Sequence, residues 1–142
     1  FRAAPRPSTA ANGSGRGGER EVQFLLRDAE RLLPVWLDGG LRLVRWGNRR
    51  GQSRSLPLTA WARLETVEAG GWLPYAAEPV EVPATLCADN GVWYKVRQGV
   101  RALLARDERG EPVVYPLVEP ASHYYQVMTR GPWMPVLIGE RI

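Results

Sequence analysis

Glycine and proline interrupt this chain so often that long helices cannot be its main structure. The fifteen glycines and twelve prolines are spread over all 142 residues rather than gathered in one tract, and both residue types end regular segments or mark turns. A hydrophobic content of 44% is enough to fill one core. The sequence therefore predicts a mainly β, α+β fold, with one domain over residues 21–142 and one or two short helices.

The Asp-Gly-Gly segment at 38–40 carries the strongest local signal. The runs on either side are apolar, and the second run begins by alternating apolar and charged side chains. Asp-Gly between two such runs is typical of a tight β-hairpin turn. A period of two directs Leu41 and Leu43 toward a core, leaves Val44 as a further candidate for it, and directs Arg42 toward solvent.

Further turns divide the rest of the domain. Ser122 suits the N-cap of a short helix, whose buried face would hold Tyr125, Val127 and Met128. The prolines within 74–83 argue against lasting regular structure there. The remaining expectations are a polar loop at 47–57, a helix or extended pass at 58–67, a turn at 107–110, that helix at 122–130, and strands at 84–86, 91–97, 100–105, 112–118 and 134–138.

The first twenty residues differ in composition from the rest. Proline, glycine, serine, alanine and arginine dominate residues 1–20, and almost no large apolar side chain follows Phe1. Such a segment can bury too little apolar surface to offset the conformational entropy that it would lose on becoming ordered. We expect a flexible N-terminal tail over 1–20, or an arm that orders on a partner. The chain begins with Phe1 and not with methionine, so translation need not have started there.

The excess of basic over acidic residues gives only a weak indication of what the chain binds. The net charge is +4 and the pI is about 9.7, which suits a polyanion. The basic residues are arginines except for Lys95, however, and they are scattered along the sequence. On charge alone we therefore favour a solvated surface of arginines over a polyanion-binding site.

The reactive residues are few. Cys87 is the sole cysteine and His123 the sole histidine, which excludes an internal disulfide and argues against a zinc site. We expect Cys87 to be a buried, inert thiol, His123 to be structural, and the chain to need no metal or cofactor.

No apolar run approaches the ~20 residues that span a bilayer, so we expect a cytoplasmic protein without membrane contact.

Six tryptophans are many for a chain of this length. Aromatic faces beside guanidinium groups suit a groove for single-stranded nucleic acid, because bases stack on the rings while phosphates meet the charges. Tryptophan is also a large core residue. We expect at least four of the six in the core and two on a surface platform. The six are Trp36, Trp46, Trp61, Trp72, Trp93 and Trp133.

Five short motifs follow one another between residues 33 and 138. They are Trp46-Gly47 after an apolar strand, Ala62-Arg63-Leu64-Glu65-Thr66, Cys87-Ala88-Asp89-Asn90-Gly91-Val92-Trp93-Tyr94, the hairpin 103–114, and Trp133-Met134-Pro135-Val136. In this order they resemble the SRAP family, the SOS response-associated proteins that shield abasic sites in single-stranded DNA. The second and the last motif match most closely.

The resemblance carries its own expectations. It implies antiparallel sheets in a partly closed, barrel-like fold, with single-stranded DNA as the partner. By resemblance, Arg63 would meet a phosphate, and Trp46 with Gly47 would form the groove edge where a base stacks. Glu65 and Arg97 complete the predicted DNA-binding set.

The chain departs from the family at the positions that perform its chemistry. Family members trap the ring-opened sugar aldehyde of an abasic site with an N-terminal cysteine, whereas residue 1 here is Phe and Cys87 has no free amine. A covalent adduct needs an attacking atom. The family's asparagine, glutamate and histidine positions hold Trp61, Tyr94 or Lys95, and a residue within 129–131. The resemblance thus predicts a catalytically degenerate member that does not crosslink to DNA.

Three functions remain open at this point. The first is a degenerate SRAP-like domain that binds single-stranded DNA weakly or serves as an interaction module. The second is a piece of an active abasic-site-processing protein whose N-terminal cysteine lies upstream. The third is a structural or interaction protein of a mobile element, with an unrelated partner.

Overall fold

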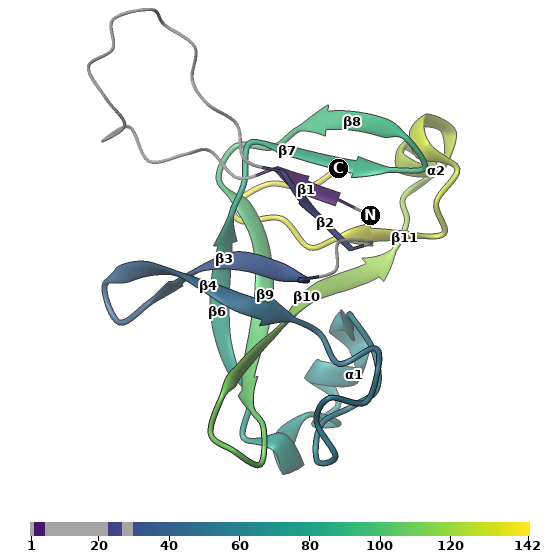
Figure 1. Ribbon diagram of the computed structural model, residues 1–142. Helices are drawn as coiled ribbons and strands as arrows, with labels where there is room; N and C mark the ends of the chain where they lie inside the picture. Colours follow the sequence, from purple (N-terminus) through teal and green to yellow (C-terminus); the bar gives the residue numbers. More distant parts are fainter. Residues whose placement is uncertain (1, 5–22, 27–29) are drawn as a thin grey trace, which may run out of the picture.

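A closed five-stranded barrel forms the body of the protein in a computed structural model, which describes residues 2–4, 23–26 and 30–142 (Figure 1). Its strands are β3 (Leu32–Leu37), β4 (Gly40–Trp46), β6 (Glu78–Pro83), β9 (Gly99–Arg106) and β10 (Pro112–Pro120). They follow the order β10-β4-β3-β6-β9, and β9 pairs with β10 to close the ring. Only β4 and β10 run parallel among these five. The mainly β, α+β fold is confirmed, with the barrel closed rather than partly closed.

A smaller antiparallel sheet accompanies the barrel. Its order is β2 (Phe24–Leu25), β1 (Arg2–Ala4), β7 (Leu86–Asp89) and β8 (Val92–Lys95). Strand β1 pairs with β2 on one side and β7 on the other, with Arg2 opposite Ala88. Residues 2–4 of the predicted tail thus form a strand, residues 5–20 lie outside the described residues, and the flexible tail over 1–20 stays a prediction.

Short elements cluster at the C-terminal half of β10. The strands β5 (Ala62–Arg63) and β11 (Trp133–Pro135) both pair with it, so that Val118 of β10 is the registered partner of Arg63 and of Pro135. The helix α1 (Leu64–Glu68) follows β5 directly, and a 3-10 turn, η1 (Leu73–Tyr75), comes next. Three segments that are distant in sequence thus meet at one place.

The helix α2 (His123–Thr129) begins as predicted. The Ser122 hydroxyl accepts a hydrogen bond from the Tyr125 backbone N–H at 3.1 Å, which caps the helix. Tyr125 is fully buried and Met128 partly buried, but Val127 is 68% exposed. Its predicted place on the buried face is wrong, because Thr129 lies one turn after Tyr125 and takes that position.

The β3–β4 hairpin forms at the predicted turn, but its inward face is not the predicted one. Asp38 and Gly39 both have positive φ, which is the geometry of a two-residue hairpin turn. Leu41 and Leu43 are exposed, whereas Val44 is buried. The hairpin tip projects beyond the barrel (Figure 1). In β4, the alternation between buried and more exposed side chains therefore begins only at Val44, where the strand enters the barrel.

The proline-rich stretch 74–83 forms more regular structure than we expected, since β6 lies within it. Strand β6 pairs with β9 from Glu78 to Pro83 but with β3 only at Glu81. Most of the β6 edge that faces β3 is therefore not paired with β3. Prolines are tolerated along such an unpaired edge, because no backbone donor is needed there.

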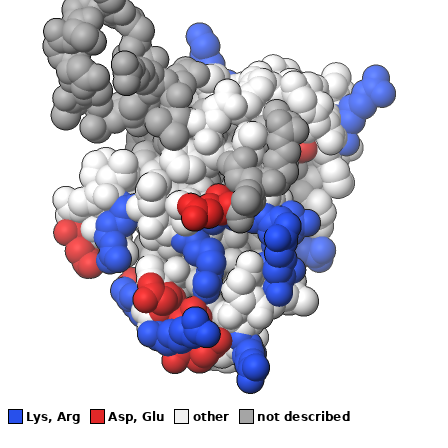
Figure 2. Space-filling model, in the orientation of Figure 1, with Lys and Arg blue, Asp and Glu red and all other residues white. Residues whose placement is uncertain are grey.

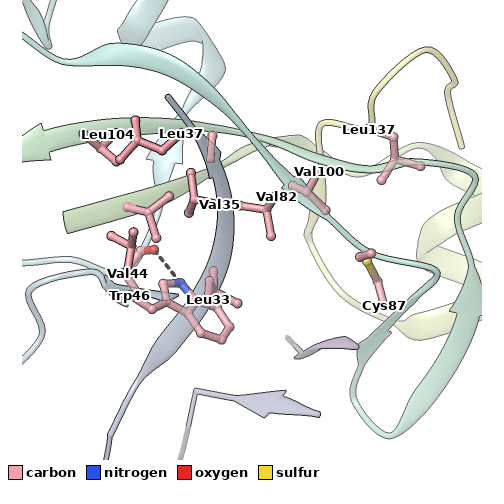
Figure 3. Close-up of a cluster of buried hydrophobic side chains, with 14 of the residues drawn as sticks. Leu33, Val35, Leu37, Val44, Trp46, Val82, Cys87, Val100, Leu104 and Leu137 are labelled. Carbon is pink, nitrogen blue, oxygen red and sulfur yellow. Dashed lines mark hydrogen bonds between the residues drawn. The ribbon is translucent and has the colours of Figure 1, made fainter. Parts of the chain in front are cut away.

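Strands β9 and β10 separate two hydrophobic clusters. Leu104 and Val114 point into the barrel and share a cluster with Trp46 and with Cys87 of β7, whereas Leu103 and Tyr115 pack outside in a second cluster around Trp72. Figure 3 shows part of the barrel cluster, including Leu33, Val35, Val82 and Val100. Strands buried on both faces read as continuous apolar runs.

Candidate nucleic-acid interface

Arg63 and Trp133 meet where β5 and β11 flank β10. The Arg63 guanidinium carbon lies 4.5 Å from the centroid of the Trp133 ring. At this distance the ring quadrupole attracts the cation. Arg63 is exposed and Trp133 half-buried, so both groups also face solvent. The structure thus supplies a positive charge on an aromatic face at the surface.

This pair forms one wall of a pocket of about 340 Å³, which we call the aromatic pocket and define by Trp61, Arg63, Asp89 and Trp133. Trp61 is half-buried and lies on the same pocket. The other lining residues are Leu26, Thr59, Val118, Pro132 and Pro135. Flat apolar surface with a few polar groups is what a planar organic ligand requires.

Asp89 supplies the acidic group of the aromatic pocket. Its Oδ2 accepts a hydrogen bond from the Tyr125 hydroxyl at 3.0 Å, and the hydroxyl groups of Tyr125 and Tyr94 lie 3.3 Å apart. Burial, the main cause, raises the pKa of both phenols above the usual range. Both tyrosines therefore stay neutral, and Tyr125 remains a donor that fixes the carboxylate.

Gly131 makes room for that carboxylate. A Cβ on Gly131 would lie 2.1 Å from Oδ2 of Asp89, which is far inside van der Waals contact. Neither Asp89 nor Arg63 belongs to an ion pair with another described residue. The aromatic pocket thus offers a ligand one cation, one hydrogen-bond acceptor and two indole rings.

Comparison with protein-family models, curated proteins and solved structures finds no match. Within the described part of the chain, no helix has the length and apolar character needed to cross a membrane. Residues 2–4, 23–26 and 30–142 likewise contain no group of three or more His, Cys, Asp or Glu that could hold a metal ion.

Trp46 does not occupy the position that the resemblance assigns to it. It is 1% exposed, its indole N–H donates to the Ala60 carbonyl at 3.1 Å, and its ring meets Trp61 edge-on at 5.3 Å. A base cannot stack on a ring that is covered, so Trp46 offers no stacking face at the predicted groove edge. Trp46 instead supports Trp61 from the barrel side.

Gly47 is also structural. Its φ is +67°, and a Cβ there would lie 2.6 Å from Cα of Ala60. Its N–H donates to the Val114 carbonyl at 2.9 Å. A glycine is therefore needed to let the chain leave β4 and pass closely against the 59–60 segment.

Glu65 and Arg97 are not among the residues that line the aromatic pocket. Glu65 is exposed in the first turn of α1. Arg97 follows β8, and its backbone N–H donates to the Glu140 carboxylate at 2.8 Å. Of the predicted set, only Arg63 belongs to this pocket. Sequence reasoning left Asp89 and Trp133 out of the set, although both lie inside the quoted motifs.

Fewer tryptophans lie in the core than the four or more that we predicted. Only Trp46 and Trp72 are buried, and Trp36 and Trp93 are exposed. The half-buried pair, Trp61 and Trp133, faces one pocket.

Cys87 is a buried thiol, as expected. It is fully buried in the barrel cluster (Figure 3). Burial, with a smaller contribution from the Glu140 charge, raises the pKa of the thiol to about 12. The sulfur therefore stays protonated near neutral pH and is not a nucleophile. His123 is exposed at the start of α2.

Proposed function

We propose that this chain binds single-stranded nucleic acid, with one base held in the aromatic pocket. The observation that carries the proposal is the Arg63 guanidinium stacked on Trp133 beside a second half-buried indole, Trp61. Bases of any sequence stack on such rings, and a guanidinium at the rim attracts the phosphate. The basic net charge of +4 supports the same partner.

Asp89 adds a preference to this pocket. A carboxylate accepts hydrogen bonds but donates none, so it favours bases with an exocyclic amino group, as aspartate does with cytosine in nucleic-acid readout. Tyr125 fixes one of its oxygens. The other oxygen has no hydrogen-bond partner among the described residues. We therefore expect cytosine or adenine to bind more tightly than thymine.

The choice of DNA over RNA comes from the family resemblance. In this proposal the chain is a degenerate SRAP-like domain that binds single-stranded DNA without a covalent step. The retained Ala62-Arg63-Leu64-Glu65-Thr66 segment supports it, because this segment forms β5 and the start of α1 and delivers Arg63 to the pocket.

Fluorescence anisotropy with a labelled strand of about ten deoxycytidines tests the proposal at about 50 mM and about 200 mM salt. We expect binding that weakens with salt, and an affinity about tenfold lower in Arg63→Ala at low salt. Arg97→Ala is the matched control, since Arg97 lies outside the pocket, and it should bind like the wild type. Absence of binding at both salt concentrations, or equal losses of affinity in the two variants, would refute the proposal.

A second candidate is the abasic-site capture that the resemblance implies for members with an N-terminal cysteine. One observation favours it: β1 places Arg2 opposite Ala88, and the next residue of β7, Asp89, lines the aromatic pocket. The N-terminal end of β1 therefore lies beside the end of β7 that carries Asp89. Intact mass of the natural full-length product with an abasic strand separates the candidates. A stable mass gain supports capture, and an unchanged mass supports binding alone.

A further inference from the structure

A second pocket, of about 220 Å³, lies where β3 begins and β4 ends. We call it the arginine pocket and define it by Arg31, Arg45, Arg49 and Arg50, with Glu30 as the one acidic lining residue. Figure 2 shows Lys and Arg side chains gathered to the right of centre, over the place where Figure 1 shows the start of β3 and the end of β4. Four guanidinium groups around so small a space leave a clear positive excess.

The charges of this pocket are largely uncompensated within the described residues. Of its four arginines, only Arg45 forms an ion pair with another described residue, Asp107 at 2.9 Å, and the Arg45 Nε is buried without a hydrogen-bond partner there. Burial, followed by the like charges of Arg50 and Arg49, lowers the pKa of Arg31. Arginines that repel one another around a hollow are stabilised by a bound anion.

The loop that carries Arg49 and Arg50 is held in place. Asn48 is fully buried, and its side-chain amide donates to the carbonyls of Ser53 and Leu56 at 3.0 Å each. The Glu108 carboxylate accepts from the Ser53 hydroxyl at 2.7 Å and ties the loop to the β9–β10 turn. The two arginines are therefore mounted on a preorganised loop, which lowers the entropic cost of binding an anion.

The arginine pocket adjoins the aromatic pocket. Trp46 lines the former, and its ring meets that of Trp61 in the latter at a centroid distance of 5.3 Å. Gly47, also on the arginine pocket, packs against the 59–60 segment, whose Thr59 lines the aromatic pocket. The linings of the two pockets are therefore joined by residues in direct contact.

We propose that the arginine pocket binds a backbone phosphate of the strand whose base lies in the aromatic pocket. The inference rests on the proposed function, and it adds a phosphate site that the family resemblance does not assign. Guanidinium groups recognise phosphate by paired hydrogen bonds. The base site would supply stacking, and the arginine pocket would supply most of the salt dependence.

The experiment compares two double variants that remove equal charge. Arg49→Gln/Arg50→Gln changes the arginine pocket, and Arg97→Gln/Arg141→Gln changes two exposed arginines outside it. All four side chains are exposed, so both proteins should fold, which circular dichroism checks. Affinity for the strand of about ten deoxycytidines is measured over a salt series by anisotropy.

We expect the Arg49→Gln/Arg50→Gln variant to bind about tenfold more weakly at low salt. The slope of log affinity against log salt should fall by about 0.7 for each phosphate that the variant no longer neutralises. The control variant should keep the wild-type slope. Arg49→Lys/Arg50→Lys should recover the slope, because lysine keeps the charge. Equal slopes in the two glutamine variants would overturn the proposal, since only net charge would then matter.

A nucleoside such as deoxycytidine separates this proposal from the proposed function. It carries no phosphate, so its affinity should be unchanged in Arg49→Gln/Arg50→Gln and reduced in Trp133→Ala. Strand binding that requires Trp133 but ignores Arg49 and Arg50 would overturn the phosphate site and leave the base site standing. A wild-type protein that binds neither probe would overturn both.

Discussion

Replacement of Trp46 by alanine should lower the free energy of unfolding by about 3–5 kcal/mol. The side chain is 1% exposed and fills the barrel with Leu33, Val35 and Val44 (Figure 3). Its loss leaves a cavity, and it also removes the indole donor from the buried Ala60 carbonyl. Urea denaturation followed by far-ultraviolet circular dichroism measures the change without relying on tryptophan fluorescence.

Trp36→Ala is the matched control for this effect. Trp36 is 53% exposed on the projecting hairpin, so its truncation should cost less than about 1.5 kcal/mol. Comparable losses of stability in the two variants would show that Trp46 is not the core residue that the structure makes it.

Trp133→Ala should weaken binding of the single strand by about 1–3 kcal/mol, or about 5- to 150-fold. The ring is both a stacking surface and the support on which the Arg63 guanidinium lies. Its removal therefore also frees Arg63 to leave the pocket. Anisotropy at low salt measures the decrease in affinity.

Two further variants control this prediction. Trp93→Ala removes an exposed ring on β8, outside the aromatic pocket, and should leave binding unchanged. Trp133→Phe keeps a smaller aromatic face and should bind more tightly than Trp133→Ala. An affinity that falls equally in Trp93→Ala and Trp133→Ala would mean that the strand does not use the aromatic pocket.

Local features of the fold can be predicted from the sequence because their causes are local. The turn at Asp38-Gly39 needs two residues with positive φ, and the Ser122 hydroxyl reaches the backbone N–H of Tyr125, only three residues further along the chain. The side to which Leu41 and Leu43 point cannot be predicted in this way. Their exposure depends on how far the hairpin extends past β6, which pairs with β3 at a single position.

The candidate site is only partly predictable for a similar reason. Arg63 can be identified because it lies in a recognisable motif. The burial of the Trp46 ring escapes sequence reasoning because it depends on the parallel pairing of β4 with β10, which brings together chain segments far apart in sequence. Asp89 and Trp133 escape sequence reasoning because β7 and β11 belong to different sheets, and only the assembled pocket shows their proximity.

The central claim is that a strand docks on Trp61 and Trp133, and indole N–H signals in a proton–nitrogen correlation spectrum test it most directly. Titration with the deoxycytidine strand should shift the signals of these two tryptophans and leave Trp72 in the second cluster unmoved. Shifts confined to Trp36 and Trp93, or none at saturating strand, would contradict the account.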